Sequence, residues 1–273
     1  QGWPYFSEHL ILATPDNGVA TAIYAACKAT VKVGDGKEIT LHEETNYPFE
    51  EAIAFTVSTD EKVAFPFYLR IPSWTQKAEV RVNGKKVSVT PVAGKYLCIN
   101  REWANGDRVE LTLPMSLSMR TWQVNKNSVS VDYGPLTLSL KIAEKYVEKD
   151  SRETAIGDSK WQKGADSKKW PTTEIYPDSP WNYSLVLDKK EPLKNFKVIR
   201  KSWPADNYPF TVASVPLEVK AIGRPVPEWK IDETGLCGVL PEEDAVKGDK
   251  EEITLIPMGA SRLRISAFPN TKE

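Results

Sequence analysis

The sequence predicts an all-β protein made of two antiparallel β-sandwich domains, of the jelly-roll or immunoglobulin-like kind. Two observations lead to this prediction: short runs alternate apolar with polar residues, and turn-forming residues separate the runs at intervals typical of a sandwich. A third observation is that no amphipathic helix of ordinary length interrupts the runs. The chain has 273 residues, of which 41% are hydrophobic, so two domains could each bury a core.

The first domain is expected over residues 15–122. Before it, apolar side chains at Tyr5, Phe6 and Leu10 fit a short helix, and an Asn17-Gly18 turn signal then marks the change to strands. The strand-like runs cover residues 19–27, 29–33, 38–45, 52–59, 63–71, 78–82, 86–89, 96–99 and 108–113. Asn83-Gly84 separates two of these runs, and an Asn-Gly pair between strands is the strongest short-range signal of a hairpin.

The second domain is expected over residues 123–273. Its strand-like runs cover residues 128–140, 184–187, 215–222, 252–257 and 263–268. Between the first two of them, residues 147–181 form a polar stretch rich in Lys, Asp, Ser and Pro, which we interpret as a long loop. Loops of this length are uncommon inside a compact domain and often serve a function or pack against another domain.

Charge and hydropathy argue against two classes of partner. The 36 Lys and Arg residues nearly balance the 37 Asp and Glu residues, and no run of basic residues exceeds two, whereas nucleic-acid binding usually needs a basic face. No apolar stretch approaches the length of a membrane span. We therefore expect neither a nucleic acid nor a membrane as partner.

The cysteines and histidines do not form a metal-binding pattern. Cys27, Cys98 and Cys237 lie far apart among apolar neighbours, and we interpret them as small core residues, with one long-range disulfide left open. Neither His9 nor His42 is near a cysteine, whereas a zinc site needs clustered Cys and His ligands. No metal or cofactor is expected in this chain.

Acidic residues occur in adjacent pairs, which do not predict a catalytic dyad. Glycoside hydrolysis needs two carboxylates that face each other across a sugar, and neighbours on a strand point to opposite faces. We interpret these pairs as surface charge, and His42 as a surface histidine. The pairs are Glu43-Glu44, Glu50-Glu51 and Glu242-Glu243-Asp244.

The nine tryptophans offer a second kind of candidate site, because exposed aromatic rings can stack on sugars. Trp74 and Trp103 are expected to be structural. Trp161, Trp170 and Trp181 lie in the polar stretch and, with Tyr183, are the candidate carbohydrate-binding residues or part of an inter-domain surface.

Several segments together resemble one family. They are Leu69-Arg70-Ile71-Pro72-Ser73-Trp74, Val82-Asn83-Gly84, Arg101-Glu102-Trp103 and Tyr133-Gly134-Pro135-Leu136. This series is similar to the region that follows the catalytic domain in glycoside hydrolase family 127, the β-L-arabinofuranosidase-like proteins. Residues 170–183 and 262–269 are similar to the form common in gut Bacteroidetes.

The resemblance implies that the chemistry lies outside this chain. Family members carry an (α/α)6 barrel with a cysteine nucleophile, an assisting glutamate and a zinc ion held by Cys and Glu. The paired cysteines of that site would precede Gln1, and none of Cys27, Cys98 and Cys237 matches them, so no catalytic or metal residue is transferred. Residues 1–14 would be a short helical remnant of the missing barrel.

We therefore predict a non-catalytic C-terminal fragment of a glycoside hydrolase that supports the missing catalytic domain. The resemblance implies retaining hydrolysis of a terminal L-arabinofuranose from plant polysaccharide or glycoprotein glycans by the parent, in the periplasm or outside the cell. A carbohydrate-binding module that binds an oligosaccharide through its exposed tryptophans is the alternative. A third hypothesis is that the chain is itself a hydrolase.

Overall fold

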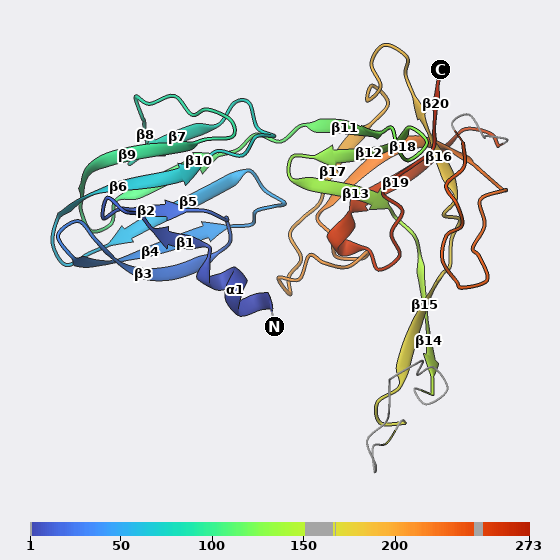
Figure 1. Cartoon of the computed structure of the whole chain (residues 1–273), viewed down its shortest axis with the longest axis horizontal. Coiled ribbons are helices and arrows are strands. Elements are labelled where there is room, and N and C mark those ends of the chain that lie inside the picture. Colours follow the sequence, from blue (N-terminus) through green and yellow to red (C-terminus); the bar gives the residue numbers. More distant parts are fainter. Residues whose placement is uncertain (1, 151–165, 167, 243–247) are drawn as a thin grey trace. The chain divides into compact units, whose positions relative to one another are not determined.

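The prediction of an all-β fold is confirmed. In the computed structural model, which describes residues 2–150, 166, 168–242 and 248–273, strands dominate (Figure 1). A single short α-helix, α1 (Gly2–Glu8), precedes them in the described residues. The chain forms two compact units, of which the first comprises Gln1–Leu117 with Tyr133–Leu136 and the second comprises Ser118–Asp132 with Thr137–Glu273. Within the described residues, no helix has the length and apolar character needed to cross a membrane.

The first unit is built from two sheets. One has the strand order β1 (Ile11–Ala13), β2 (Val19–Thr21), β6 (Val63–Arg70) and β9 (Tyr96–Trp103). The other has the order β3 (Cys27–Val33), β4 (Lys37–Thr45), β5 (Ala52–Ser58), β10 (Arg108–Thr112), β7 (Glu79–Val82) and β8 (Lys85–Lys86). The β2–β6 pair is parallel, and the other pairs are antiparallel.

Alternating burial along the strands places the core between these two sheets. On β6, Phe65 and Phe67 are buried while the residues between them are less so, as expected for a strand with one face inward. Phe55 of the six-stranded sheet meets Phe67 of the four-stranded sheet edge to face, with ring centroids 5.4 Å apart. Trp103 is fully buried beside them, and its indole Nε1 donates a hydrogen bond to the Phe65 carbonyl at 3.0 Å. Trp103 is therefore structural, as expected, but it lies in the core at the end of β9 rather than at a loop position.

The Asn83-Gly84 hairpin is confirmed between β7 and β8. Both residues have positive φ, 50° and 76°, which is the backbone that a two-residue type I′ turn requires. The hairpin is short, since only Arg81 and Val82 pair with Lys86 and Lys85.

The second unit is built around one eight-stranded sheet. Its order is β11 (Leu117–Trp122), β12 (Ser128–Tyr133), β13 (Leu136–Leu140), β19 (Glu251–Pro257), β18 (Leu217–Pro225), β16 (Tyr183–Leu187) and β20 (Asn270–Lys272), and β17 (Lys197–Arg200) pairs with β18. A 3-10 turn, η1 (Met258–Ala260), follows β19. Because β11 pairs with β12 in this sheet, the second unit begins before residue 123, earlier than the sequence suggests.

The C-terminal segment joins strands from distant parts of this sheet. Phe268 forms an antiparallel bridge with Val129 of β12, and β20 pairs in parallel with β16. The expected strand over residues 263–268 is reduced to this one bridge, because the segment crosses from β13 toward β16. The sheet thus curls around a core that includes Val131, Leu185 and Phe268.

The long polar stretch also contains regular structure that the sequence analysis missed. β14 (Glu144–Lys149) and β15 (Thr172–Pro177) pair antiparallel over six residues and extend from the second unit as a two-stranded ribbon (Figure 1). No residue of this ribbon is fully buried, so its pairing comes from backbone hydrogen bonds rather than from a core of its own.

Candidate functional site

The structure separates the four residues proposed for sugar binding. Trp161 lies outside the described residues. Trp170 is 65% exposed, and Trp181 is half-buried beside the end of β15. Tyr183 begins β16 and is only 7% exposed, so its ring cannot serve as an open stacking platform. Of the four, Trp181 lies in a cavity that could admit a ligand.

This cavity, which we call the Trp181 pocket, is mostly apolar. It has a volume of about 290 Å³ and is lined by residues from β15, from the segment between β13 and β14, from the segment after β18 and from the segment before β20. Among them are Ile142, Tyr176, Leu236 and Cys237. The Trp181 ring packs edge to face on Trp229, with centroids 5.2 Å apart, which holds it in place. The pocket itself offers the rings of Trp181 and Tyr176 on an apolar wall.

Two arginines supply the charged lining of the Trp181 pocket. The Arg264 Nε donates to the Ser261 carbonyl at 2.9 Å, and an Arg262 Nη donates to the Phe210 carbonyl at 3.4 Å. Each guanidinium carries five N–H donors, so these bonds leave donor capacity on both groups. An apolar wall with a few donors suits the ring and the hydroxyl groups of a sugar.

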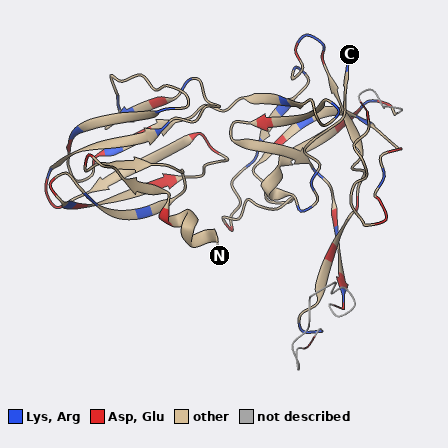
Figure 2. Cartoon of the chain, in the orientation of Figure 1, with Lys and Arg blue, Asp and Glu red and all other residues tan. Residues whose placement is uncertain are grey.

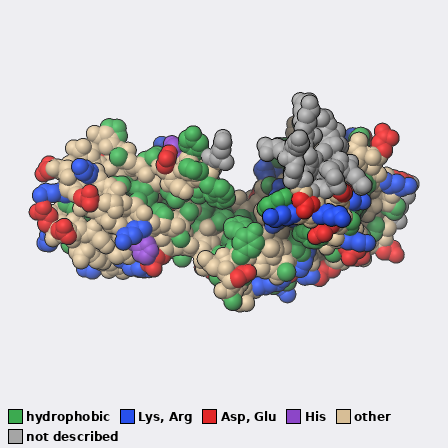
Figure 3. Space-filling model, turned by 90° about the horizontal axis from the view of Figure 1, so that it is seen from below, with side chains coloured by type: hydrophobic (Ala, Val, Ile, Leu, Met, Phe, Trp, Pro, Cys, Tyr) green, Lys and Arg blue, Asp and Glu red, His purple; other side chains and the backbone are tan. Residues whose placement is uncertain are grey.

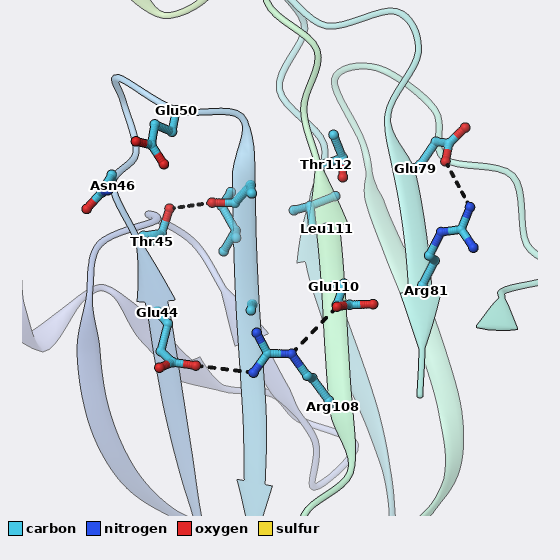
Figure 4. Close-up of a pocket in the computed structure, with 13 residues that line it drawn as sticks. Glu44, Thr45, Asn46, Glu50, Glu79, Arg81, Arg108, Glu110, Leu111 and Thr112 are labelled. Atoms are coloured by element: carbon cyan, nitrogen blue, oxygen red, sulfur yellow. Dashed lines mark hydrogen bonds and ion pairs between the residues drawn. The ribbon is translucent and has the colours of Figure 1, made fainter. Parts of the chain in front are cut away.

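A second and larger hollow lies on the outer face of the six-stranded sheet in the first unit (Figure 4). Its volume is about 630 Å³, and its lining comes from β4, the loop after β4, β5, β10 and β7. The sequence analysis did not propose this site, because its residues lie far apart in the chain. We call it the sheet hollow.

Strand register explains the shape of the sheet hollow. Glu44 of β4 is paired with Ala54 of β5, Ala54 with Glu110 of β10, and Glu110 with Arg81 of β7. These four residues form a row on the same face of the sheet. Alanine is the small member of the row, so the surface is low over β5 and higher on either side.

Ion pairs link the charged side chains around the sheet hollow. The Arg108 Nη1 lies 3.2 Å from a Glu44 carboxylate oxygen, and its Nε lies 3.6 Å from a Glu110 oxygen (Figure 4). Arg81 lies 3.8 Å from Glu79 on the same strand. Because all these groups are about half exposed, we do not expect the pairs to add much stability.

Glu43 corrects the interpretation of the paired acids as surface charge. Glu43 is 1% exposed, whereas Glu44 beside it is exposed, because successive strand residues face opposite sides and this register turns Glu43 inward. A Glu43 oxygen accepts the Ala25 N–H at 3.0 Å, and the other lies 3.8 Å from the Cys27 sulfur. Burial raises the pKa of Glu43 to about 8.

Cys27 does not provide an activated nucleophile. Burial, together with the Glu43 charge, raises the pKa of the Cys27 thiol to about 11, so little thiolate is present at neutral pH. All three cysteines are free, and Cys237 is exposed. The expectation of a buried core residue is therefore wrong for Cys237, because it lies in an exposed segment that pairs back on itself through a bridge between Cys237 and Ile231. Among the described residues, no three His, Cys, Asp or Glu side chains are grouped to hold a metal ion.

Charge is distributed without a single dominant sign. Figure 2 shows Lys and Arg interspersed with Asp and Glu on both units. This agrees with the balanced composition.

The helix α1 presents apolar side chains to solvent. Trp3 is 76% exposed and Tyr5 is 66% exposed, and Phe6 is exposed as well. No residue of α1 is buried, and the Trp3 and Phe6 rings meet edge to face, with centroids 5.8 Å apart. Figure 3 shows hydrophobic side chains gathered at the surface over this helix. Leu10, after the helix, is buried.

Comparison with known protein families gives a match, which lies in the first unit. Residues 18–115 match the family described as the middle domain of GH127 beta-L-arabinofuranosidase, which confirms the resemblance over this range. The comparison with curated proteins gives no match.

Solved structures share the fold of nearly the whole chain. The GH127 beta-L-arabinofuranosidase from Geobacillus stearothermophilus T6 is 21% identical, with a TM-score of 0.62 over 97% of this chain and 35% of that one. A structure named glycoside hydrolase is 21% identical, with a TM-score of 0.61 over 94% and 36%. A GH127 beta-arabinofuranosidase is 22% identical, with a TM-score of 0.60 over 94% and 36%. The chain thus spans about a third of the length of these proteins.

Proposed function

We propose that the chain is a non-catalytic C-terminal part of a glycoside hydrolase, on the premise that residues 18–115 match the GH127 middle domain. Its role is to brace a catalytic domain that precedes it. The parent enzyme would hydrolyse β-L-arabinofuranosides, as the names of the structural neighbours suggest for their own activity. This chain covers only 35% of the length of the first of these structures, which supports a longer parent protein.

The observation that carries this proposal is the exposed apolar surface of α1. Exposed apolar area costs about 25 cal/mol for each Å² left in water, and contiguous aromatic patches on soluble proteins commonly mark an interface. Trp3, Tyr5 and Phe6 make such a patch on a helix of seven residues that buries none of its side chains. A helix this short is not stable by itself in water, so a partner surface would also hold its conformation.

The chemistry of the described residues supports a non-catalytic role. Cys27 has a raised pKa, and Glu43 is enclosed in the core of the first unit. The carboxylates that do reach a hollow, Glu44 and Glu110, are both paired with Arg108. A pair of carboxylates held by one arginine between them is poorly placed to act as acid and nucleophile on opposite sides of a sugar.

Two measurements test the proposal. An antibody against this chain should detect, in the source cells, a protein about three times its mass, in keeping with the 35% coverage. The purified chain should release no sugar from an aryl β-L-arabinofuranoside, whereas the longer protein should do so. Release by the chain alone would support the hypothesis that it is itself a hydrolase, and a cellular protein of only 30.6 kDa would refute the proposed parent.

A variant of the longer protein tests the role of α1. Changing Trp3, Tyr5 and Phe6 to serine should lower its melting temperature and its activity, because the helix would lose its apolar contacts. A matched control is the serine variant of Val124, a fully exposed apolar residue outside α1. An equal effect of the two changes would contradict the role of α1.

The Trp181 pocket favours a second candidate function, oligosaccharide binding. Its specific support is that Trp181 and Tyr176 line one apolar cavity with two arginines. Calorimetric titration of the chain with arabino-oligosaccharides should give heat that is lost on Trp181→Ala and kept on Trp170→Ala. Absence of heat at millimolar ligand would exclude this candidate.

A further inference from the structure

We propose that the sheet hollow of the first unit binds a neutral oligosaccharide chain laid across β4, β5 and β10. This site is separate from α1 and from the Trp181 pocket. It goes beyond the bracing role, because a surface that only braces a neighbour needs no ligand.

The floor of the hollow fits the apolar side of a sugar ring. Ala52 and Ala54 occupy alternate positions of β5 and therefore share the outer face of the sheet. Both line the hollow, with longer side chains from the strands on either side. The two methyl groups give a flat apolar strip, against which the C–H groups of a ring can pack.

The walls of the hollow alternate acceptors with donors. A carboxylate only accepts hydrogen bonds and a guanidinium only donates them. Across the sheet these groups follow one another: Glu44 contacts Arg108, Arg108 contacts Glu110, and Glu110 stands opposite Arg81 in the strand pairing. Figure 4 shows these side chains around the hollow, with Arg108 between the two glutamates.

This alternation favours a neutral polyol over an ion. A hydroxyl group donates one hydrogen bond and accepts others, so neighbouring hydroxyls of a sugar can satisfy a carboxylate and a guanidinium together. An anion that approaches Arg108 also meets Glu44 and Glu110, and a cation that approaches either glutamate also meets Arg108. Along this row neither sign is favoured, so an ion would gain little there. The whole lining also includes Glu50 and Glu79 and so holds four carboxylates and two guanidiniums; the cation in the test below measures whether this surplus attracts a positive ligand.

The size of the hollow fits a small ligand. Its volume of about 630 Å³ lies in the range of small-molecule sites, roughly 300–1,000 Å³. Thr45, Asn46 and Thr112 add neutral polar groups at its edges.

The test is calorimetric titration of the whole chain with three probes. Arabinotriose serves as the neutral probe, spermidine as the cation and inorganic phosphate as the anion. Ala54→Tyr fills the floor of the hollow with a residue that suits a strand, and should weaken arabinotriose binding by about tenfold or more. Thr30→Tyr is the matched control, since Thr30 is exposed on β3 of the same sheet and lies outside the hollow.

The outcomes separate the sites and the ligand classes. The titrations are made in a Trp181→Ala background, which removes the binding that the second candidate function expects at the Trp181 pocket. Arabinotriose binding that is then lost with Ala54→Tyr and kept with Thr30→Tyr supports the proposal. Binding that survives Ala54→Tyr, heat with spermidine or phosphate alone, or no heat with arabinotriose overturns it. If Ala54→Tyr does not fold, Arg108→Gln replaces it, because this change removes the central donor and keeps the floor. Because the bracing role is tested by α1 and by enzyme activity, it can survive the failure of this site.

Discussion

The substitution Glu43→Gln should remove a pH dependence from the stability of the first unit. Glu43 lies in the interior of this unit, where it accepts the Ala25 N–H and lies beside the Cys27 sulfur. Glutamine has nearly the same shape, keeps a carbonyl oxygen that can accept the Ala25 N–H and does not ionise near neutral pH. The variant therefore removes the titration with little change to the packing.

The sign and the size follow from the raised pKa of Glu43. Burial raises this pKa from 4.5 to about 8, so between these values the unfolded chain releases a proton that the folded chain keeps. The free energy of unfolding of the wild type then falls as the pH rises through this window, by up to about 1.4 kcal/mol for each pH unit. Over the whole window the loss is at most about 5 kcal/mol, and above about pH 8 it stops growing because both states are ionised.

The assay is urea unfolding followed by tryptophan fluorescence at several pH values between 4.5 and 8. Glu43→Gln should exceed the wild type in stability by an amount that grows with pH. Glu38→Gln is the matched control, because Glu38 lies on the same strand and is exposed. Equal pH slopes for the wild type and Glu43→Gln would refute the reasoning, and would mean that Glu43 ionises in the folded state as readily as in the unfolded chain.

Two further predictions concern the cores. Trp103→Phe leaves the buried Phe65 carbonyl without its indole donor and should lower the free energy of unfolding by about 1–3 kcal/mol in urea titrations; an unchanged midpoint would contradict it. In the second unit, burial works against ionisation of Glu218, but hydrogen bonds from Lys141 and Lys201, both at 2.6 Å, lower its pKa. Ionised Glu218 therefore stabilises the second unit, and this stabilisation is lost as the pH falls below 4.5. In Glu218→Gln, the melting temperature should fall less steeply with decreasing pH in this range than in the wild type. An equally steep fall would contradict the prediction.

Local patterns in the sequence predicted the fold class well. Alternating residues identified β4, β5 and β6, and Asn83-Gly84 located a hairpin, because side-chain period and turn backbone depend on near neighbours. The segment after β14 was harder to predict. Residues 172–177 read as part of a loop, yet they form β15, because their pairing partner lies across the polar stretch and no local signal reports it.

The acidic residues show the same contrast between what the local sequence determines and what only the folded chain decides. The sequence by itself determined that Glu43 and Glu44 face opposite sides of a strand, since that follows from the strand period. Only the tertiary structure decided which of them is buried, because that depends on which face of the sheet packs on the core. The sheet hollow likewise needs residues of β4, β5 and β10 side by side, and strand register brings Glu44, Ala54 and Glu110 together across 66 positions of sequence, between residues 44 and 110. Long-range pairing is a property of the folded chain, so no spacing in the sequence could have revealed this site.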